Sequence, residues 1–192
     1  IAFDEATAIL AGDSLLTLAF DAMARDEAHP NPVTRSALVL GLARASGLGG
    51  MAGGQMLDLM AETETPDEDG IKRLQAMKTG ALLRFACEGG AGFAEASAED
   101  QARLREFGRL TGAAFQLADD ILVITSDAVT MGKATGKDED AGKGTLVALY
   151  GLDKARSILN NLIKEAEAEM APFGGKADVL LETARFIAER DH

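Results

Sequence analysis

The apolar residues of this chain are mostly of the kinds that favour helices. Among 192 residues there are 35 Ala and 24 Leu, against only 6 Val and 8 Ile. Alanine and leucine are strong helix formers, whereas the β-branched residues that favour strands are scarce here. The composition therefore predicts an all-α fold and excludes an all-β domain. With 47% hydrophobic residues, the chain is long enough to bury one substantial core.

Capping signals divide the chain into helices. The dipeptides Asn31-Pro32 and Thr65-Pro66 have the form of an N-cap followed by proline at the first helical position, and Ser97 with Asp100 reads as a capping box. Glycines stand where the apolar periodicity stops, at positions 47, 89, 90, 151 and 174–175. The pattern predicts one domain over 1–192, an antiparallel helical bundle with helices near 2–26, 32–47, 50–63, 68–88, 98–126, 145–170 and 176–190.

The charge balance narrows the possible partners and compartment. With 19 basic and 31 acidic residues the net charge is −12, which repels nucleic-acid phosphates and anionic lipid, so neither is expected as a partner. The single cysteine, Cys87, cannot form an internal disulfide, and no apolar stretch is expected to reach the roughly 20 residues of a membrane span. The segment Ile1–Ala11 lacks the basic start of a signal peptide. These features predict a cytoplasmic protein.

One segment breaks the helical pattern. Residues 127–144, DAVTMGKATGKDEDAGKG, contain almost nothing apolar after Met131 and are predicted to form a long solvated loop. Loops of this length are usually lids, binding loops or mobile connections. Its lysines, Lys133, Lys137 and Lys143, could supply cations to a site beneath it.

Two adjacent carboxylates, Asp119 and Asp120, stand in the otherwise apolar segment 115–124. Ionised carboxylates cost several kcal/mol each to bury without partners, so they must face water, a cation or a metal. Gln116 precedes them by three and four residues and lies on their side of the helix. A surface edge or a buried ion pair would explain the pattern; so would a site for Mg²⁺, which binds through carboxylates and substrate phosphates.

A lysine interrupts an apolar helical stripe between Ile71 and Phe85. Lys78 lies in the middle of this stripe, where core residues are expected. Its ammonium group either reaches out to solvent, pairs with Asp119 or Asp120, or holds an anion that enters a cavity. Thr79 adds a hydroxyl group beside it. In a chain this acidic, a polyphosphate could bind only with a divalent metal and a few placed lysines.

The glycine-rich run 49–54 lacks the spacing of a nucleotide-binding loop, and close helix packing explains it better. Gln55 and Asp58, which follow it, form a small polar face whose simplest interpretation is an internal hydrogen bond. Cys87 is expected to be a small buried hydrophobic residue.

Six segments together resemble the trans-isoprenyl diphosphate synthases, most closely the bacterial farnesyl diphosphate synthases. Their order and spacing match over essentially the whole chain. The segments are GDSLLTLAF at 12–20, GGMAGGQMLDL at 49–59, KTGALLRF at 78–85, AFQLADDIL at 114–122, GKATGKDEDAGKGT at 132–145 and FIAER at 186–190.

The resemblance implies a helical bundle of the isoprenoid synthase type and a homodimer. It implies a Mg²⁺-dependent prenyltransferase that condenses an allylic diphosphate, dimethylallyl or geranyl diphosphate, with isopentenyl diphosphate to give farnesyl diphosphate. The resemblance also implies roles for the matching positions. Lys78, Thr79 and Lys133 would contact the allylic diphosphate, and Gln116, Asp119 and Asp120 would belong to the second aspartate-rich motif, which holds the metal. Lys143 would be a later lysine of the loop.

Two departures from the family pattern matter. The second motif normally reads DDxxD, but Val123 stands where its last carboxylate should be, and Asp127 could replace that carboxylate only if the helix end bends back. The first aspartate-rich motif would precede residue 1, so the N-terminal helices of the family, about a third of a member, are not in this sequence. The 192 residues alone are therefore expected to be inactive. A non-catalytic prenyl-diphosphate-binding homologue or partner subunit is the main alternative, and a terpene cyclase the weaker one.

Overall fold

The computed structural model describes residues 3–130 and 145–190, which form helices without any strand, as the composition predicted. The helices are α1 (Glu5–Ala24), α2 (Pro32–Ser46), α3 (Met51–Ala61), α4 (Glu68–Gln75), η1 (Ala76–Gly80), α5 (Ala81–Phe93), α6 (Ala98–Thr130), α7 (Leu146–Tyr150), α8 (Leu152–Met170), η2 (Ala171–Ala177) and α9 (Asp178–Glu189).

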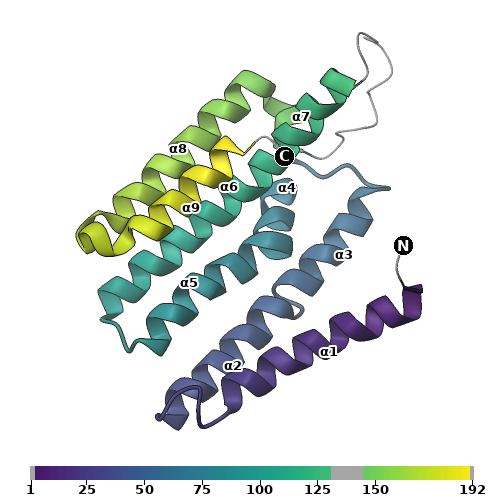
Figure 1. The fold of residues 1–192 in the computed structure, drawn as a ribbon. Helices are drawn as coiled ribbons and strands as arrows, with labels where there is room; N and C mark the ends of the chain where they lie inside the picture. Colours follow the sequence, from purple (N-terminus) through teal and green to yellow (C-terminus); the bar gives the residue numbers. More distant parts are fainter. Residues whose placement is uncertain (1–2, 131–144, 191–192) are drawn as a thin grey trace.

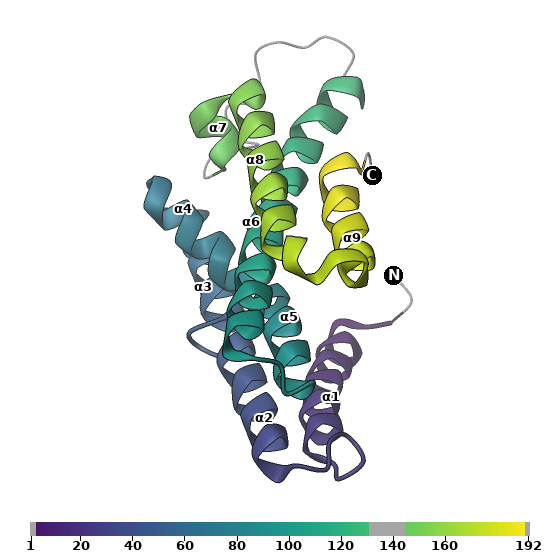
Figure 2. The same cartoon turned by 90° about the vertical axis from the view of Figure 1, so that its left-hand side faces the viewer.

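The long helices lie side by side in nearly the order of the chain. In Figure 1 they run from α1 and α2 at the lower right, through α5 and α6, to α8 and α9 at the upper left. α6 packs against α5 on one side and against α8 and α9 on the other, as the view in Figure 2 also shows. α6 is therefore the central helix of the described fold, and it carries residues 119 and 120, both of which are partly buried.

The core is built around α6. Leu110, Ala114 and Leu117 are almost fully buried there, and they pack with the apolar stripe of α8, which includes Leu159 and Ile163. The apolar residues of α6 recur three and four residues apart, so one helix face meets α8 along its length. This packing fixes the orientation of α6 and of the polar side chains on its remaining face.

Local capping chemistry set several helix starts as predicted. The Asn31 side chain accepts a hydrogen bond from the Val33 backbone N–H at 3.0 Å, and Ser97 Oγ accepts one from the Asp100 backbone N–H at 3.1 Å. The cap predicted at Thr65-Pro66 was wrong, because Asp67 is the cap, but the helix start predicted near residue 68 is confirmed, since α4 begins at Glu68. The Asp67 carboxylate accepts from the Gly70 N–H at 2.8 Å, which makes it the stronger cap.

Glycine positions were less reliable signals of helix ends. Gly89 and Gly90 do not end α5, which continues to Phe93, because α5 is held between α2 and α6 and this packing outweighs the low helix propensity of glycine. Gly151, with φ of 80°, separates α7 from α8 within the predicted helix 145–170. α6 extends to Thr130, a few residues beyond the prediction.

The N-terminal helix α1 has no buried residue and contacts α2. Its large apolar side chains are exposed, among them Ile9, Leu10, Leu15 and Leu18. By length and composition alone, α1 is also the one described helix that could cross a membrane. The prediction that no apolar stretch reaches this length was therefore wrong for α1, in which Ala, Leu and Ile outweigh three acidic residues.

Candidate functional site

Lys78 and Thr79 lie in a π-helical turn between two α-helices. α4, η1 and α5 follow one another without a break, and the π turn η1 spans Ala76–Gly80. Such turns insert one extra residue and redirect the side chains that they carry, and they are frequent at functional sites. The sequence predicted one continuous helix here and did not predict the change of register at Lys78.

α3 crosses η1 at backbone contact distance. A Cβ atom built on Gly54 would lie 2.2 Å from the backbone N of Lys78 and 2.6 Å from its Cα, so only glycine fits at this crossing. Asp58 lies one turn after Gly54 on α3, and its carboxylate Oδ2 is 2.5 Å from the Lys78 ammonium Nζ. Close packing of the glycine-rich run thus brings Asp58 and Lys78 together.

A chain of side-chain hydrogen bonds links η1 to α6. The Thr79 hydroxyl is 3.1 Å from Gln116 Oε1, and the Gln116 amide Nε2 donates to Asp120 Oδ1 at 3.2 Å. The amide of Gln75, which is buried at the end of α4, donates to Asp120 Oδ2 at 2.9 Å. Each Asp120 oxygen therefore accepts one amide hydrogen bond and keeps a further lone pair for another donor or a cation.

The environment of Asp120 disfavours its charged form. Burial raises its pKa to about 6, and the negative charge of Asp119 adds to the rise, while hydrogen bonds from Gln116 and Gln75 oppose it. Within the described part of the chain, no cationic side chain contributes to this balance. An approaching cation would therefore favour the ionised form of Asp120.

Asp119 has a cationic partner from the last helix. The guanidinium Nη2 of Arg190, at the end of α9, forms an ion pair with Asp119 Oδ1 and donates to the Phe115 carbonyl oxygen at 3.2 Å. The guanidinium also lies over the Phe115 ring, 4.2 Å from its centre. The Arg190 Nε atom is buried and makes no hydrogen bond to the described residues. Arg190 thus supplies positive charge beside a carboxylate that was predicted to hold metal.

The structure brings five of the predicted residues into one region: Lys78, Thr79, Gln116, Asp119 and Asp120. The alternative in which Lys78 pairs with Asp119 or Asp120 was wrong, because its partner is Asp58 on the other side of η1. Most of the predicted loop, including Lys133, Lys137 and Lys143, lies outside the described residues. The predicted role of the loop therefore stays a prediction.

Val123 is 57% exposed, so the position of the missing carboxylate faces away from the core. Among the described residues, no group of three or more Asp, Glu, His or Cys side chains could hold a metal ion without help. Two adjacent carboxylates with hard oxygen ligands still match what Mg²⁺ takes from a protein when substrate phosphates complete its coordination.

Three contacting residues were not predicted as members of the site: Asp58, Gln75 and Arg190. The sequence could have indicated Asp58, because it follows the glycine-rich run by about one helical turn. Glycines allow a neighbouring helix to come close, so a polar side chain at this position can reach that helix. Gln75 is three residues before Lys78 and gave no signal. Arg190 was noted as part of the segment FIAER, but nothing in the sequence indicates that it meets Asp119, 71 residues away.

Comparison with known proteins gives the family. The sequence model described as Polyprenyl synthetase matches residues 1–173. The chain is 39% identical to the farnesyl diphosphate synthase of Escherichia coli K12, covering 100% of this chain and 64% of that protein. It is 38% identical to the chloroplastic geranylgeranyl pyrophosphate synthase 3 of Arabidopsis thaliana, covering 98% and 54%. This chain belongs to the polyprenyl synthetase family.

Solved structures agree with this assignment. The apo structure of an FPP/GFPP synthase from Zymomonas mobilis matches with a TM-score of 0.84 and 41% sequence identity, covering 97% of this chain and 62% of that one. The all-α fold is therefore that of the isoprenyl diphosphate synthases, as the sequence predicted. The chain spans less than two thirds of the length of these relatives.

Proposed function

We propose that the protein containing this chain is a short-chain prenyltransferase that condenses an allylic diphosphate with isopentenyl diphosphate. The observation that carries the proposal is the convergence of Lys78 and Thr79 from η1 with Gln116, Asp119 and Asp120 from α6. Cationic and hydroxyl donors on one side and carboxylates on the other suit a diphosphate held with a metal ion. The product is farnesyl diphosphate in this proposal, although relatives include a geranylgeranyl pyrophosphate synthase.

Lys78 and Thr79 act on the diphosphate leaving group. The Lys78 ammonium and the Thr79 hydroxyl would donate to its oxygens, so negative charge that develops as the allylic carbon–oxygen bond breaks is stabilised where it forms. Asp58 holds the ammonium in place before substrate arrives, since its carboxylate lies 2.5 Å away. Gln116 holds the Thr79 hydroxyl in the same way at 3.1 Å.

Asp119 and Asp120 would hold Mg²⁺, with Lys133 and Lys143 as further diphosphate contacts carried over from the family resemblance. When bound, the metal neutralises diphosphate charge and assists departure of the leaving group. Arg190 occupies one oxygen of Asp119, so the guanidinium must move or share this carboxylate when the site is loaded. Because Val123 replaces a carboxylate, we expect weak affinity for metal in the absence of diphosphate.

A homodimer is part of the proposal. It is supported by the family resemblance and by the exposed apolar side chains of α1, which a second copy would cover.

The main alternative is a non-catalytic homologue that binds prenyl diphosphates or partners an active subunit. The exposed Val123 favours it, because one carboxylate that the family places one turn beyond Asp119 is missing.

Binding of geranyl diphosphate tests the proposal. Isothermal titration calorimetry on the 192-residue chain should show binding with Mg²⁺ present and a large loss in excess chelator. The Asp119→Ala variant should lose the increase in geranyl diphosphate affinity that Mg²⁺ causes. The Thr79→Val variant should bind geranyl diphosphate more weakly but should still respond to Mg²⁺. Equal binding in chelator, or an unchanged Asp119→Ala variant, would overturn the assignment.

Condensation itself is expected to fail with this chain alone. Orienting two reactants can lower a barrier by about 7–11 kcal/mol, and the candidate site proposed here accounts for the allylic diphosphate but not for isopentenyl diphosphate. Incubation with labelled isopentenyl diphosphate, geranyl diphosphate and Mg²⁺ should give no extractable product. Turnover near one per second, typical of enzymes, would contradict this expectation.

A further inference from the structure

A second cavity lies away from the site described above. It has a volume of about 550 Å³ and is formed by α2, α5 and the start of α6. It shares no lining residue with the candidate site. On α5 its lining begins at Ala81, after the π turn, and continues to Gly92 at the other end of the helix. This groove is therefore separate from the candidate site.

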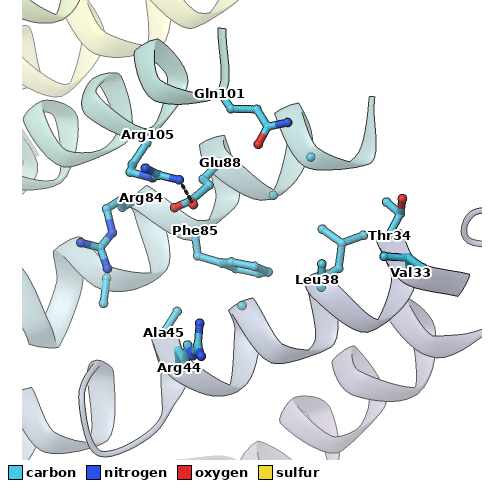
Figure 3. A pocket seen from close by; sticks show the side chains of 15 residues that line it. Val33, Thr34, Leu38, Arg44, Ala45, Arg84, Phe85, Glu88, Gln101 and Arg105 are labelled. Carbon is cyan, nitrogen blue, oxygen red and sulfur yellow. Dashed lines mark hydrogen bonds and ion pairs between the residues drawn. The ribbon is translucent and has the colours of Figure 1, made fainter. Parts of the chain in front are cut away.

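The groove has a cationic end and an apolar end. Figure 3 shows Arg44, Arg84 and Arg105 toward one end, Leu38 and Val33 toward the other, and the Phe85 ring between them.

The helix register agrees with this view. A Cβ built on Gly41 of α2 would meet Phe85, and one built on Gly89 of α5 would lie 3.5 Å from Leu38. α2 and α5 are thus antiparallel along the groove, so Val33 and Gly92 share one end while Arg44 and Ala81 share the other.

The charges in the groove are unusual for this chain. Its lining carries three arginines and one carboxylate, a net charge of +2 in a chain of −12. Arg105 is paired with Glu88 at 2.6 Å, but Arg44 and Arg84 make no hydrogen bond or ion pair to another described residue.

Most arginines of the described chain form ion pairs with carboxylates: Arg25, Arg35, Arg103, Arg105, Arg109, Arg185 and Arg190. Arg73 and Arg156, outside the groove, form none to the described residues, so what distinguishes Arg44 and Arg84 is that both line one cavity. Two guanidinium groups that have no partner among the described residues and line the same cavity are donors available to an anion.

We propose that this groove binds a phosphorylated amphiphile, with the phosphate between Arg44 and Arg84 and the apolar chain along Phe85 toward Leu38 and Val33. Guanidinium groups match phosphate oxygens in charge and geometry, and a dianionic headgroup balances the net charge of the lining. The volume is within the range of sites that enclose small organic ligands. This inference does not depend on the proposed prenyltransferase activity.

The probe is decyl phosphate, titrated below its micelle concentration into the 192-residue chain and followed by calorimetry in chelator, which suppresses the metal-dependent site. We expect saturable binding of decyl phosphate. Inorganic phosphate and decanol should each bind with much lower affinity. Decanoate, with a single negative charge, should also bind more weakly than decyl phosphate. If decanol or decanoate binds equally well, the phosphate assignment is wrong.

Three variants locate the ligand. Arg44→Gln should weaken binding about tenfold, whereas Arg156→Gln, the same charge change at an exposed site on α8, should not; equal effects would mean nonspecific attraction and would overturn the proposal. Arg44 is preferred to Arg84 for this test because Arg84 also lines a smaller cavity of about 320 Å³.

Gly92→Leu fills the apolar end. A Cβ at Gly92 meets no atom within 4 Å, and leucine favours a helix more than glycine does, so the variant should fold with unchanged or higher stability. It should abolish the gain in affinity that the decyl chain gives over inorganic phosphate. Retention of full affinity by a folded Gly92→Leu variant would show that the chain binds elsewhere, for example on α1.

Discussion

The close crossing of α3 over η1 can be tested by a substitution that adds a single methyl group at Gly54. In Gly54→Ala the new Cβ would lie 2.2 Å from the backbone N of Lys78, so one helix must shift. Overpacking of this kind costs about 1–3 kcal/mol, and the better helix propensity of alanine returns up to about 1 kcal/mol. We expect a net loss of about 1–2 kcal/mol, or roughly 2–8 °C in Tm for a domain of this size.

Gly90→Ala is the matched control. Gly90 also lies within a helix, but a Cβ there meets nothing within 4 Å, so the same substitution should raise stability by up to about 1 kcal/mol. Urea unfolding of both variants gives the two free energies on one scale. If Gly54→Ala stabilises the protein as Gly90→Ala does, α3 does not approach Lys78 as described, and the link from the glycine run to the Asp58–Lys78 pair fails.

Three further predictions concern the site. Lys78→Met should change the free energy of unfolding by about 1 kcal/mol or less, because the side chains of Lys78 and Asp58 are both about a third exposed. The affinity for diphosphate should fall clearly. A loss of several kcal/mol in stability would show that the Lys78–Asp58 pair is structural instead. The pKa of Asp120 is raised to about 6 from the value near 4 of an unfolded chain, so the folded protein binds more protons between these values and loses stability as pH rises through them. Asp120→Asn removes this cost, and its advantage over the native chain in urea unfolding should grow from pH 4 to just above pH 6 and then level off; an advantage independent of pH would contradict the raised pKa. Val123→Asp should strengthen Mg²⁺-dependent diphosphate binding with a stability change within about 0.5 kcal/mol, since Val123 is exposed; calorimetry showing weaker binding would mean that this position does not face the metal.

What could be predicted from the sequence is what depends on local chemistry. The helix starting after Asn31 follows from a cap and a proline, and the pair Asp119-Asp120 stands out because carboxylates are costly in an apolar helix. The resemblance assigned Thr79 and Gln116 to one active site, but their hydrogen bond was not predicted from either segment.

What could not be predicted depends on how helices cross. One of the three alternatives for Lys78 was a partner on α6, but the register of the π turn and the approach of α3 at Gly54 present it to Asp58. Arg190 meets Asp119 only because α9 folds back along α6. Gly89 was expected to end a helix, and the packing of α5 between its neighbours overrides that local preference.

The central claim is that Asp119 and a bound diphosphate hold one divalent cation together. Mn²⁺, which takes the same oxygen ligands as Mg²⁺, reports this through the electron paramagnetic resonance signal of the free ion. We predict that the signal falls when the chain and inorganic diphosphate are both present, beyond the fall that diphosphate alone causes. Asp119→Asn should abolish the additional fall. An equal fall in Asp119→Asn, or a full fall without diphosphate, would contradict the account.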